Sequence, residues 1–388
     1  MSASRLDVAV VGAGAAGAAA AYHLALRGHS VAVIEPGPFP RPKPCGGGMA
    51  ASVQRWFPCD LSPVVDRVID RVRFTWCLDD PVIADLPGES PFWIVTRLKL
   101  DAYLLNQAQN HGAELLMGFS LIGIEADQGG WRLQLKGSGG EQSLCCAALV
   151  LANGSKGNFA HQLGLGDPQP RLASALAVDL DGEVLEETTA RFEFGLVKNG
   201  FCWCFPRLGG YSIGVGTFLG KTSALHNNDL ATNYDQVLSK LLPSLGFEAT
   251  AGRRRPWPLR VWNGHYPLHG DAVLAVGDAA SLADPFLAEG LRPALLSGLR
   301  SAEALHQWFG GDPNALAGYS ATMRSEWGES MQWGRRIGQV FYRFPKVGYQ
   351  LGIKRPTAPQ RIAQILSGEM GYGDIAQRVI RRLMFGFK

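Results

Sequence analysis

Short apolar runs along the chain predict the strands of a buried parallel sheet. Such strands carry apolar residues on both faces and therefore form continuous Val-, Ile- and Leu-rich runs. Four segments have this character: residues 6–11, 30–34, 149–153 and 272–276. Two further segments have helical character: residues 15–27, an Ala-rich stretch that ends at Gly28, and residues 97–111. Strands that alternate with helices predict an α/β fold.

A different pattern interrupts this alternation. Residues 74–93 and 172–262 contain strand-like stretches such as 190–194 and 201–205, which are typical of antiparallel strands. The predicted organisation is a discontinuous Rossmann-like domain, an inserted antiparallel-sheet domain and a helical C-terminal region. The Rossmann-like domain comprises residues 1–73, 94–171 and 263–330. The inserted domain comprises residues 74–93 and 172–262, and the C-terminal region comprises residues 331–388.

Composition excludes several classes of function. The chain has 388 residues and a net charge of +3, which gives no reason to expect a nucleic-acid partner. Its seven cysteines form no CxxC pair and its eight histidines show no paired spacing, so we expect no metal site. The N-terminal residues lead directly into a strand, and no apolar run reaches the roughly 20 residues of a membrane-spanning helix. We therefore expect a cytoplasmic protein, soluble or attached to a membrane surface, whose oligomeric state the sequence leaves open.

The first candidate for chemistry is a glycine-rich turn between the first strand and the first helix. Gly12, Gly14 and Gly17 form a GxGxxG pattern that includes Ala15 and Ala16, and Glu35, followed by Pro36, ends the next strand. Gly12 permits a tight turn, Gly14 lets the backbone approach a pyrophosphate, and Gly17 lets helix and strand pack closely. The alternative is a glycine-rich turn without a ligand. The preceding strand, the following helix and an acidic residue at the sequence spacing typical of a ribose ligand favour a dinucleotide site.

A second motif distinguishes FAD from NAD. Gly277 and Asp278 follow the strand predicted at 272–276, where an Asp can bind a ribityl hydroxyl. The chain here resembles the flavoproteins built like para-hydroxybenzoate hydroxylase, in which Gly-Asp-Ala is the second FAD motif. Arg97, with Asp101 one turn later, resembles the arginine contact of that family to the flavin nucleotide; a solvated charge at a helix start is the alternative. The predicted cofactor is FAD.

Three further stretches narrow the resemblance. The first is a Pro-Cys-Gly-Gly loop with Cys45, Gly46, Gly47, Gly48 and Met49. The second is an aromatic signature made of Phe201, Trp203, Phe205, Pro206, Gly214 and Gly216. The third is a turn with Pro285, Glu289, Gly290 and Leu291. These stretches resemble the geranylgeranyl reductase family, including its chlorophyll-pathway branch. The resemblance implies that the loop and the turn, which lies beside the flavin ring, bind FAD and that the aromatic signature binds a prenyl substrate.

The aromatic signature has a direct physical interpretation as well. Phe201, Trp203 and Phe205 share one face of a strand because side chains alternate with period two. Such a wall suits an apolar polyene; three ordinary core aromatics are the alternative. Cys45 and Tyr211 are the candidate proton donors, and filling a gap in the packing is the alternative for Cys45.

Three positions depart from the family pattern. Asn153 stands where an Asp-Gly motif associated with nicotinamide is common, and Ala288 replaces a frequent glycine. Arg292 occupies the position of a common aromatic residue and predicts contact with an anionic substrate head group. The expected electron donor is therefore either NADPH or reduced ferredoxin, a small iron–sulfur protein.

Together these motifs predict an FAD-dependent reductase of isolated C=C bonds in a polyprenyl chain. A flavin monooxygenase or halogenase on the same fold is one alternative, because its aromatic signature is similar and fold alone does not fix chemistry. A catalytically inactive FAD-dependent carrier of an isoprenoid or pigment is the other.

The C-terminal region carries a strong positive charge. Residues 331–388 contain eleven Lys and Arg against two Asp and Glu, with aromatic residues between them. The segment 375–387 places Ile375, Val379, Leu383 and Met384 near one helical stripe flanked by Arg378, Arg381 and Arg382. This layout predicts an interfacial helix that contacts an anionic membrane. The alternative is a solvated helical end that covers the flavin domain.

Overall fold

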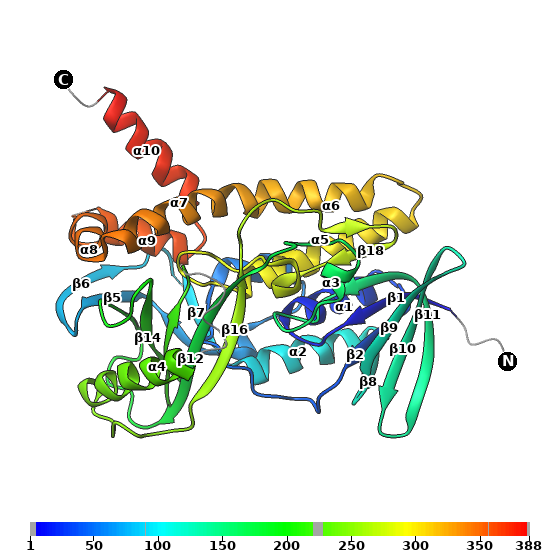
Figure 1. Ribbon diagram of the computed structural model, residues 1–388, viewed down its shortest axis with the longest axis horizontal. Helices are drawn as coiled ribbons and strands as arrows, with labels where there is room; N and C mark the ends of the chain where they lie inside the picture. Colours follow the sequence, from blue (N-terminus) through cyan, green and yellow to red (C-terminus); the bar gives the residue numbers. More distant parts are fainter. Residues whose placement is uncertain (1–4, 90, 220–227, 356, 386–388) are drawn as a thin grey trace.

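The computed structural model describes residues 5–89, 91–219, 228–355 and 357–385. Two large sheets lie at opposite ends of an elongated molecule, and the C-terminal helices extend along one side of both (Figure 1). The α/β fold predicted from the sequence is confirmed: a parallel sheet with helices, a second and mainly antiparallel sheet, and a helical C-terminal region.

The first sheet has the strand order β17-β18-β11-β1-β2-β8, with β9 and β10 continuing from β11 as an antiparallel ribbon. Its strands are β1 (Leu6–Val11), β2 (Val31–Glu35), β8 (Glu114–Met117), β9 (Ser120–Asp127), β10 (Gly130–Gly137), β11 (Gly140–Leu151), β17 (His269–Gly270) and β18 (Val273–Ala275). The β1, β2, β8, β11 and β18 strands run parallel. The sequence pattern did not predict the β9–β10 ribbon, whose strands carry mostly polar or half-buried side chains.

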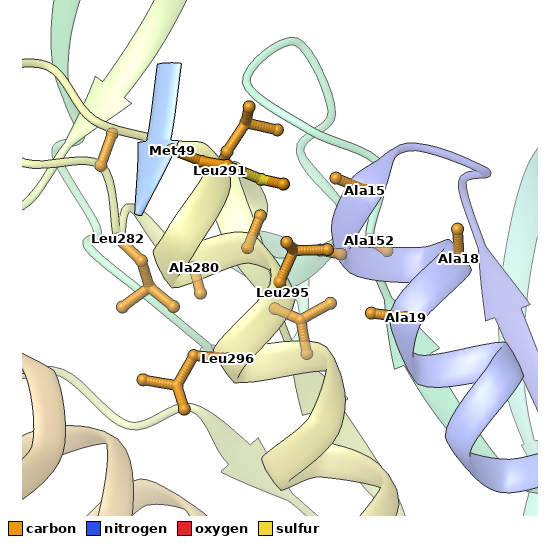
Figure 2. Close-up of a cluster of buried hydrophobic side chains, with 14 of the residues drawn as sticks. Ala15, Ala18, Ala19, Met49, Ala152, Ala280, Leu282, Leu291, Leu295 and Leu296 are labelled. Atoms are coloured by element: carbon orange, nitrogen blue, oxygen red, sulfur yellow. The ribbon is translucent and has the colours of Figure 1, made fainter. Parts of the chain in front are cut away.

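Helices α1 (Ala15–Leu26) and α5 (Leu291–Phe309) pack closely against each other beside this sheet. The approach depends on small residues: a Cβ atom at Gly298 would lie 2.5 Å from the Ala16 carbonyl oxygen. Figure 2 shows Leu295 of α5 directed toward the alanines of α1. The close contact holds the glycine-rich turn and the residues that begin α5 in one rigid unit.

The second sheet has the order β16-β12-β15-β14-β13-β5-β6. Its strands are β5 (Arg71–Trp76), β6 (Asp79–Asp85), β12 (Arg171–Asp181), β13 (Thr189–Phe194), β14 (Gly200–Arg207), β15 (Gly210–Thr217) and β16 (Arg255–Val261). Pairing is antiparallel except between β13 and β5, which run parallel. A separate small sheet contains β3 (Gly48–Ala50), β4 (Val65–Ile69) and β7 (Phe92–Val95). The segment 74–93 therefore contributes to two sheets.

The remaining helices connect or cover these sheets. They are α2 (Arg97–Asn110), α3 (Phe159–Gln162), α4 (Asn228–Leu241), α6 (Ala315–Met323), α7 (Glu329–Arg343), α8 (Pro345–Gly352), α9 (Ala358–Leu366) and α10 (Tyr372–Phe385). Helix α4 contacts β12 and β15. Among the described residues, no helix has the length and apolar character to cross a bilayer.

Much of the C-terminal region is part of the core. Phe341, Tyr342 and Tyr349 are buried, and the Tyr349 hydroxyl donates to the Asp80 carbonyl (2.6 Å), with the Phe74 carbonyl also within hydrogen-bond distance (3.2 Å). Phe341 packs on Phe194 of β13, so Phe341 and Tyr349 attach α7 and α8 to the second sheet, whereas the Tyr342 hydroxyl donates to the Phe286 carbonyl beside the turn before α5. Helix α10 projects from the body (Figure 1). The side chains of Val379, Arg382, Leu383 and Met384 lie outside the described residues.

Candidate active site

One cavity of about 1230 Å³, its open mouth included, lies between the glycine-rich turn and the second sheet. It brings together most of the residues that the sequence singled out: Gly14, Ala15, Ala16, Cys45, Gly46, Gly47, Gly48, Arg97, Phe201, Trp203, Phe205, Asp278, Glu289, Gly290 and Leu291. Segments far apart in the sequence thus form one continuous space. One end is polar and rich in glycine, and the other is aromatic.

The three glycines of the GxGxxG pattern differ in what surrounds them. A Cβ atom at Gly12 would lie 2.4 Å from the Ala152 carbonyl oxygen, and its φ of +107° also favours glycine. At Gly17 a Cβ would lie 1.9 Å from the Gly12 carbonyl oxygen. At Gly14 the nearest atom is Arg97 Nη2, 3.7 Å away. Gly12 and Gly17 are therefore required by the fold, whereas the open space at Gly14 belongs to the cavity.

Cations and carboxylates line the polar end. Arg97 forms a buried, two-bond ion pair with Asp101, at 2.8 Å through Nε and 2.6 Å through Nη2. Lys43 Nζ lies 3.7 Å from Asp278 Oδ2, and burial lowers the pKa of Lys43. Helix α1 has no side-chain cap at Gly14, so N–H groups of its first turn are available to a phosphate.

Glu35 lies at the end of β2, as predicted, but it is buried and does not line the cavity. Its Oε2 atom accepts a hydrogen bond from the Ala13 N–H at 2.9 Å, and Arg41 Nε lies 3.2 Å from Oε1. Pro36, which follows it, also lies outside the lining. Glu35 therefore braces the glycine-rich turn from behind in this structure.

The Cys45 loop joins the two ends of the cavity. The Cys45 carbonyl accepts a hydrogen bond from Ser212 Oγ of β15 at 3.2 Å, and Cys45 Sγ accepts one from the Gly47 N–H at 3.3 Å. Gly47 has φ +78°, and a Cβ there would lie 2.0 Å from the Val95 carbonyl oxygen. The loop is thus pinned between β7 and β15. Met49, at its end, is fully buried in the cluster around Leu291 (Figure 2) and does not line the cavity.

The aromatic end confirms the alternation predicted for β14. Phe201, Trp203 and Phe205 line the cavity, whereas Cys202 and Cys204 belong to a separate core cluster with α4 residues. Gly214 makes room for the indole, because a Cβ there would lie 2.1 Å from Trp203 Cζ2, and Gly216 does the same for Phe218. These two glycines shape the wall without lining the cavity, and Pro206 does not line it either.

Two expectations are corrected by the geometry. Tyr211 packs against the separate α4 cluster, and its hydroxyl accepts a hydrogen bond from the Leu185 N–H at 3.0 Å. Side chains alternate along β15, and Ser212 faces the Cys45 loop, so its neighbour Tyr211 points away from the cavity. Tyr211 is therefore not placed to donate a proton there. Arg292 is also absent from the lining: it pairs with Glu289 and stacks on Trp327, 5.1 Å from the ring centroid. It therefore holds a protein carboxyl and not a substrate head group.

A buried group of charges lies beside the cavity, around the turn that precedes α5. Asp284 is fully buried, and Pro285 next to it is buried and lies outside the lining. Burial raises the pKa of Asp284, and burial raises the pKa of Glu289 to about 7. Tyr372 of α10 donates a hydrogen bond to Asp284 Oδ2 at 2.6 Å.

Sequence reasoning missed several lining residues. They include Lys43, Phe92, Phe192, Phe218 and Trp257. Phe192 faces the same side as Trp203, its cross-strand partner in β14, so period-two alternation could have found it. Trp257 lies beneath two cations, Lys43 at 5.4 Å and Lys156 at 4.5 Å from its ring centroid, and no sequence motif marks this contact.

The site fits FAD. The space at Gly14, the uncapped start of α1 and the Arg97 and Lys43 cations suit a pyrophosphate, while Asp278 suits a ribityl hydroxyl. The Cys45 loop and the turn before α5 line the same cavity, and the space between them suits a planar ring. Bound there, FAD supplies two-electron redox chemistry.

The fold and the site together define an FAD-dependent oxidoreductase. The family model described as FAD dependent oxidoreductase matches residues 7–57 and 89–308, and the chain belongs to that family. The protein is therefore a redox enzyme.

Relatives support the narrower resemblance. Digeranylgeranylglycerophospholipid reductase 2 of Methanothermobacter thermautotrophicus is 27% identical over 87% of this chain and 86% of its own length. The crystal structure of a geranylgeranyl bacteriochlorophyll reductase-like protein of Thermoplasma acidophilum matches with a TM-score of 0.77 at 18% identity, covering 94% of this chain and 91% of that one. The flavin-dependent brominase Bmp2 matches with a TM-score of 0.70 at 19% identity, over 98% and 100% of the respective chains. These structures share the fold, and the resemblance to geranylgeranyl reductases is confirmed.

Proposed function

We propose that the protein reduces isolated C=C bonds in a polyprenyl chain. The observation that carries this proposal is the continuity of one cavity from the glycine-rich turn to an aromatic wall. An unactivated alkene offers little charge to stabilise, so the protein contributes mainly positioning and exclusion of water. The aromatic faces of Phe201, Trp203 and Phe205 suit such a chain, and the Methanothermobacter relative is named a digeranylgeranylglycerophospholipid reductase.

Each group of residues has a defined part in this proposal. Arg97, Lys43, Asp278 and the start of α1 hold the cofactor, and the Cys45 loop borders the space for its ring. Trp203, seated over Gly214, fixes the prenyl chain against that ring. The electron donor that restores the reduced cofactor is either NADPH or reduced ferredoxin.

The test uses the purified, reduced holoprotein under anaerobic conditions. It is incubated with geranylgeranyl diphosphate, a geranylgeranylated glycerophospholipid or geranylgeranylated chlorophyllide, and the products are read by mass. Gain of two mass units per reduced bond is expected for at least one substrate. No gain with any of them, together with rapid oxygen-dependent hydroxylation or halogenation, would identify the monooxygenase or halogenase alternative. Tight binding without turnover would identify a carrier.

We further propose that the C-terminal region contacts an anionic membrane, from which a prenyl lipid would enter the cavity. Four apolar side chains are exposed at the end of α7, at the residue between the helices and along α8: Val340 (70%), Phe344 (59%), Val347 (54%) and Leu351 (54%). Exposed cations, among them Arg336, Arg343 and Lys346, lie among them. Exposed apolar groups among cations fit a lipid surface, where each cation contributes about 1 kcal/mol.

Cosedimentation with vesicles tests this contact. Binding to anionic vesicles that weakens as salt rises is expected, and the double variant Val340→Glu with Val347→Glu should lose it. Leu208→Glu, at an equally exposed position (58%) on the turn between β14 and β15, is the matched control and should bind like the wild type. Deletion of 373–388 measures the share of α10. Equal binding to neutral vesicles, or binding by the double variant, would contradict the proposal.

A further inference from the structure

Three charged side chains with little solvent exposure form a cluster where the turn before α5 borders the cavity. The side chains of Glu289 and Arg292 are 8% and 11% exposed, and Arg292 Nη2 lies 2.7 Å from Glu289 Oε2. Asp284 is fully buried at the other end of the same turn, which closes through a bond from the Asp284 N–H to the Glu289 carbonyl at 2.9 Å. Only Glu289 of the three lines the cavity.

The cluster contains two carboxyl groups and one guanidinium. Two fully ionised carboxylates would leave an uncompensated negative charge in the protein interior, which is costly. Neighbouring carboxyls in this situation retain a proton between them. Other groups that face the cluster are the phenols of Tyr372 and Tyr342, from α10 and α7, whose pKa values are raised by burial. These phenols stay neutral and add no positive charge.

Hydrogen bonding decides which carboxyl holds the proton. Asp284 accepts bonds from the N–H groups of Phe286 (2.6 Å) and Leu287 (3.0 Å) and from the Tyr372 hydroxyl (2.6 Å). Three donors stabilise its ionised form. Glu289 has Arg292 at Oε2, while its buried Oε1 has no hydrogen-bond partner among the described residues. The proton therefore belongs on Glu289 Oε1.

We infer that Glu289 is the proton donor for alkene reduction, an inference that rests on the proposed function. It is a carboxylic acid kept neutral by its surroundings at the wall of the cavity. Burial, together with the charge of Asp284, raises its pKa to about 7 against the opposing effect of Arg292. A pKa near the working pH suits a general acid. Arg292, held over Trp327, is a positioning residue for this carboxyl.

Reduction of one double bond requires a hydride and a proton. One alkene carbon takes the hydride and its electron pair, which reduced FAD supplies on becoming oxidised. The other carbon takes the proton from Glu289. The π bond breaks, two C–H bonds form, and Glu289 becomes a carboxylate that regains a proton from water after the product leaves.

An infrared titration of the holoprotein tests the charge state without turnover. The carbonyl band of a protonated carboxylic acid should disappear with a midpoint near pH 7, and Glu289→Gln should lack this transition. Asp284→Asn removes a negative charge that raises the pKa of Glu289, so its midpoint should move to lower pH. Absence of a band that depends on Glu289 would overturn the inference, whatever the protein reduces.

Anaerobic single-turnover rates test the donor role. The wild-type rate should fall as the pH rises through about 7, because the proton is then lost. Glu289→Gln should be slower by on the order of 100-fold, with FAD bound and no such pH dependence. Glu289→Asp should retain part of the rate. Glu193→Gln is the matched control: Glu193 is another buried carboxyl with a raised pKa, but it bonds Thr75 and the Leu78 N–H away from the cavity.

The outcomes separate the two proposals. A wild type that reduces no isoprenoid defeats the proposed function, while the infrared titration still reports the charge of Glu289. A wild type that does reduce one, with Glu289→Gln equally fast and equally dependent on pH, overturns the donor role. The donor role is also overturned if Cys45→Ser, and not Glu289→Gln, removes the pH-dependent step.

Discussion

The two ends of the cavity are built on opposite principles. At the cofactor end the critical positions are glycines, and at the substrate end they are large aromatic side chains. Even among the glycines the reason differs: Gly12 and Gly17 are excluded from carrying a side chain by backbone atoms, but Gly14 is not. The comparison shows that a motif can combine residues needed by the fold with residues needed only by a ligand.

The largest expected effect is at Gly17. A Cβ there would lie 1.9 Å from the Gly12 carbonyl oxygen, so Gly17→Val should displace α1 from β1 and destabilise the protein by more than about 3 kcal/mol. Denaturant unfolding and the yield of folded protein measure this. Wild-type stability would show that α1 can shift without cost.

Gly14→Val should instead leave the fold intact and weaken FAD binding by on the order of 100-fold or more, because the side chain would occupy the pyrophosphate space. Flavin titration and thermal unfolding of the flavin-free protein separate the two effects. Gly318→Val is a suitable control, since this α6 glycine also faces open space, and it should bind FAD normally. Normal FAD binding by Gly14→Val would show that the pyrophosphate does not bind at this turn.

At the aromatic end, Trp203→Ala should greatly reduce prenyl turnover while FAD stays bound, at a stability cost of about 3–5 kcal/mol. Cys204→Ala provides the comparison within one strand, because Cys204 faces the α4 cluster, and should leave turnover unchanged. The measurements are steady-state rates and flavin content. Equal rates of prenyl turnover in the wild type and a folded Trp203→Ala variant would show that the aromatic wall is an ordinary part of the hydrophobic core.

The smallest effect at neutral pH concerns His23, in the last turn of α1 and outside the cavity lining. Burial lowers its pKa to about 3 from 6.5, so the folded state favours neutral imidazole. Its contribution to stability is present above pH 6.5 and is lost as the pH falls toward about 3. Between pH 6 and 4 the wild type should lose about 1.4 kcal/mol per pH unit relative to His23→Leu, as measured by denaturant unfolding. Parallel pH profiles would mean that His23 is protonated in the folded protein.

The sequence predicted β1 at its observed bounds and α1 to within a residue, because apolar runs and glycine spacing are local signals. It predicted the face of β14 for the same reason. It did not predict the directions of Tyr211 and Arg292, which stand next to motif residues yet serve a separate core cluster and a protein carboxyl. Proximity to a motif carries no information about where a side chain points.

The sequence by itself determined the class of this protein, since a strand, a glycine-rich turn and a helix in order define a nucleotide site wherever they occur. Only the tertiary structure decided how the site is completed. Asp284, Arg292 and Tyr372 are remote from the fingerprint, and Tyr372 is remote from the other two in sequence. The pKa of Glu289 depends on which charges and donors those segments bring within a few ångströms, and a distance of that kind is fixed only when the chain has folded.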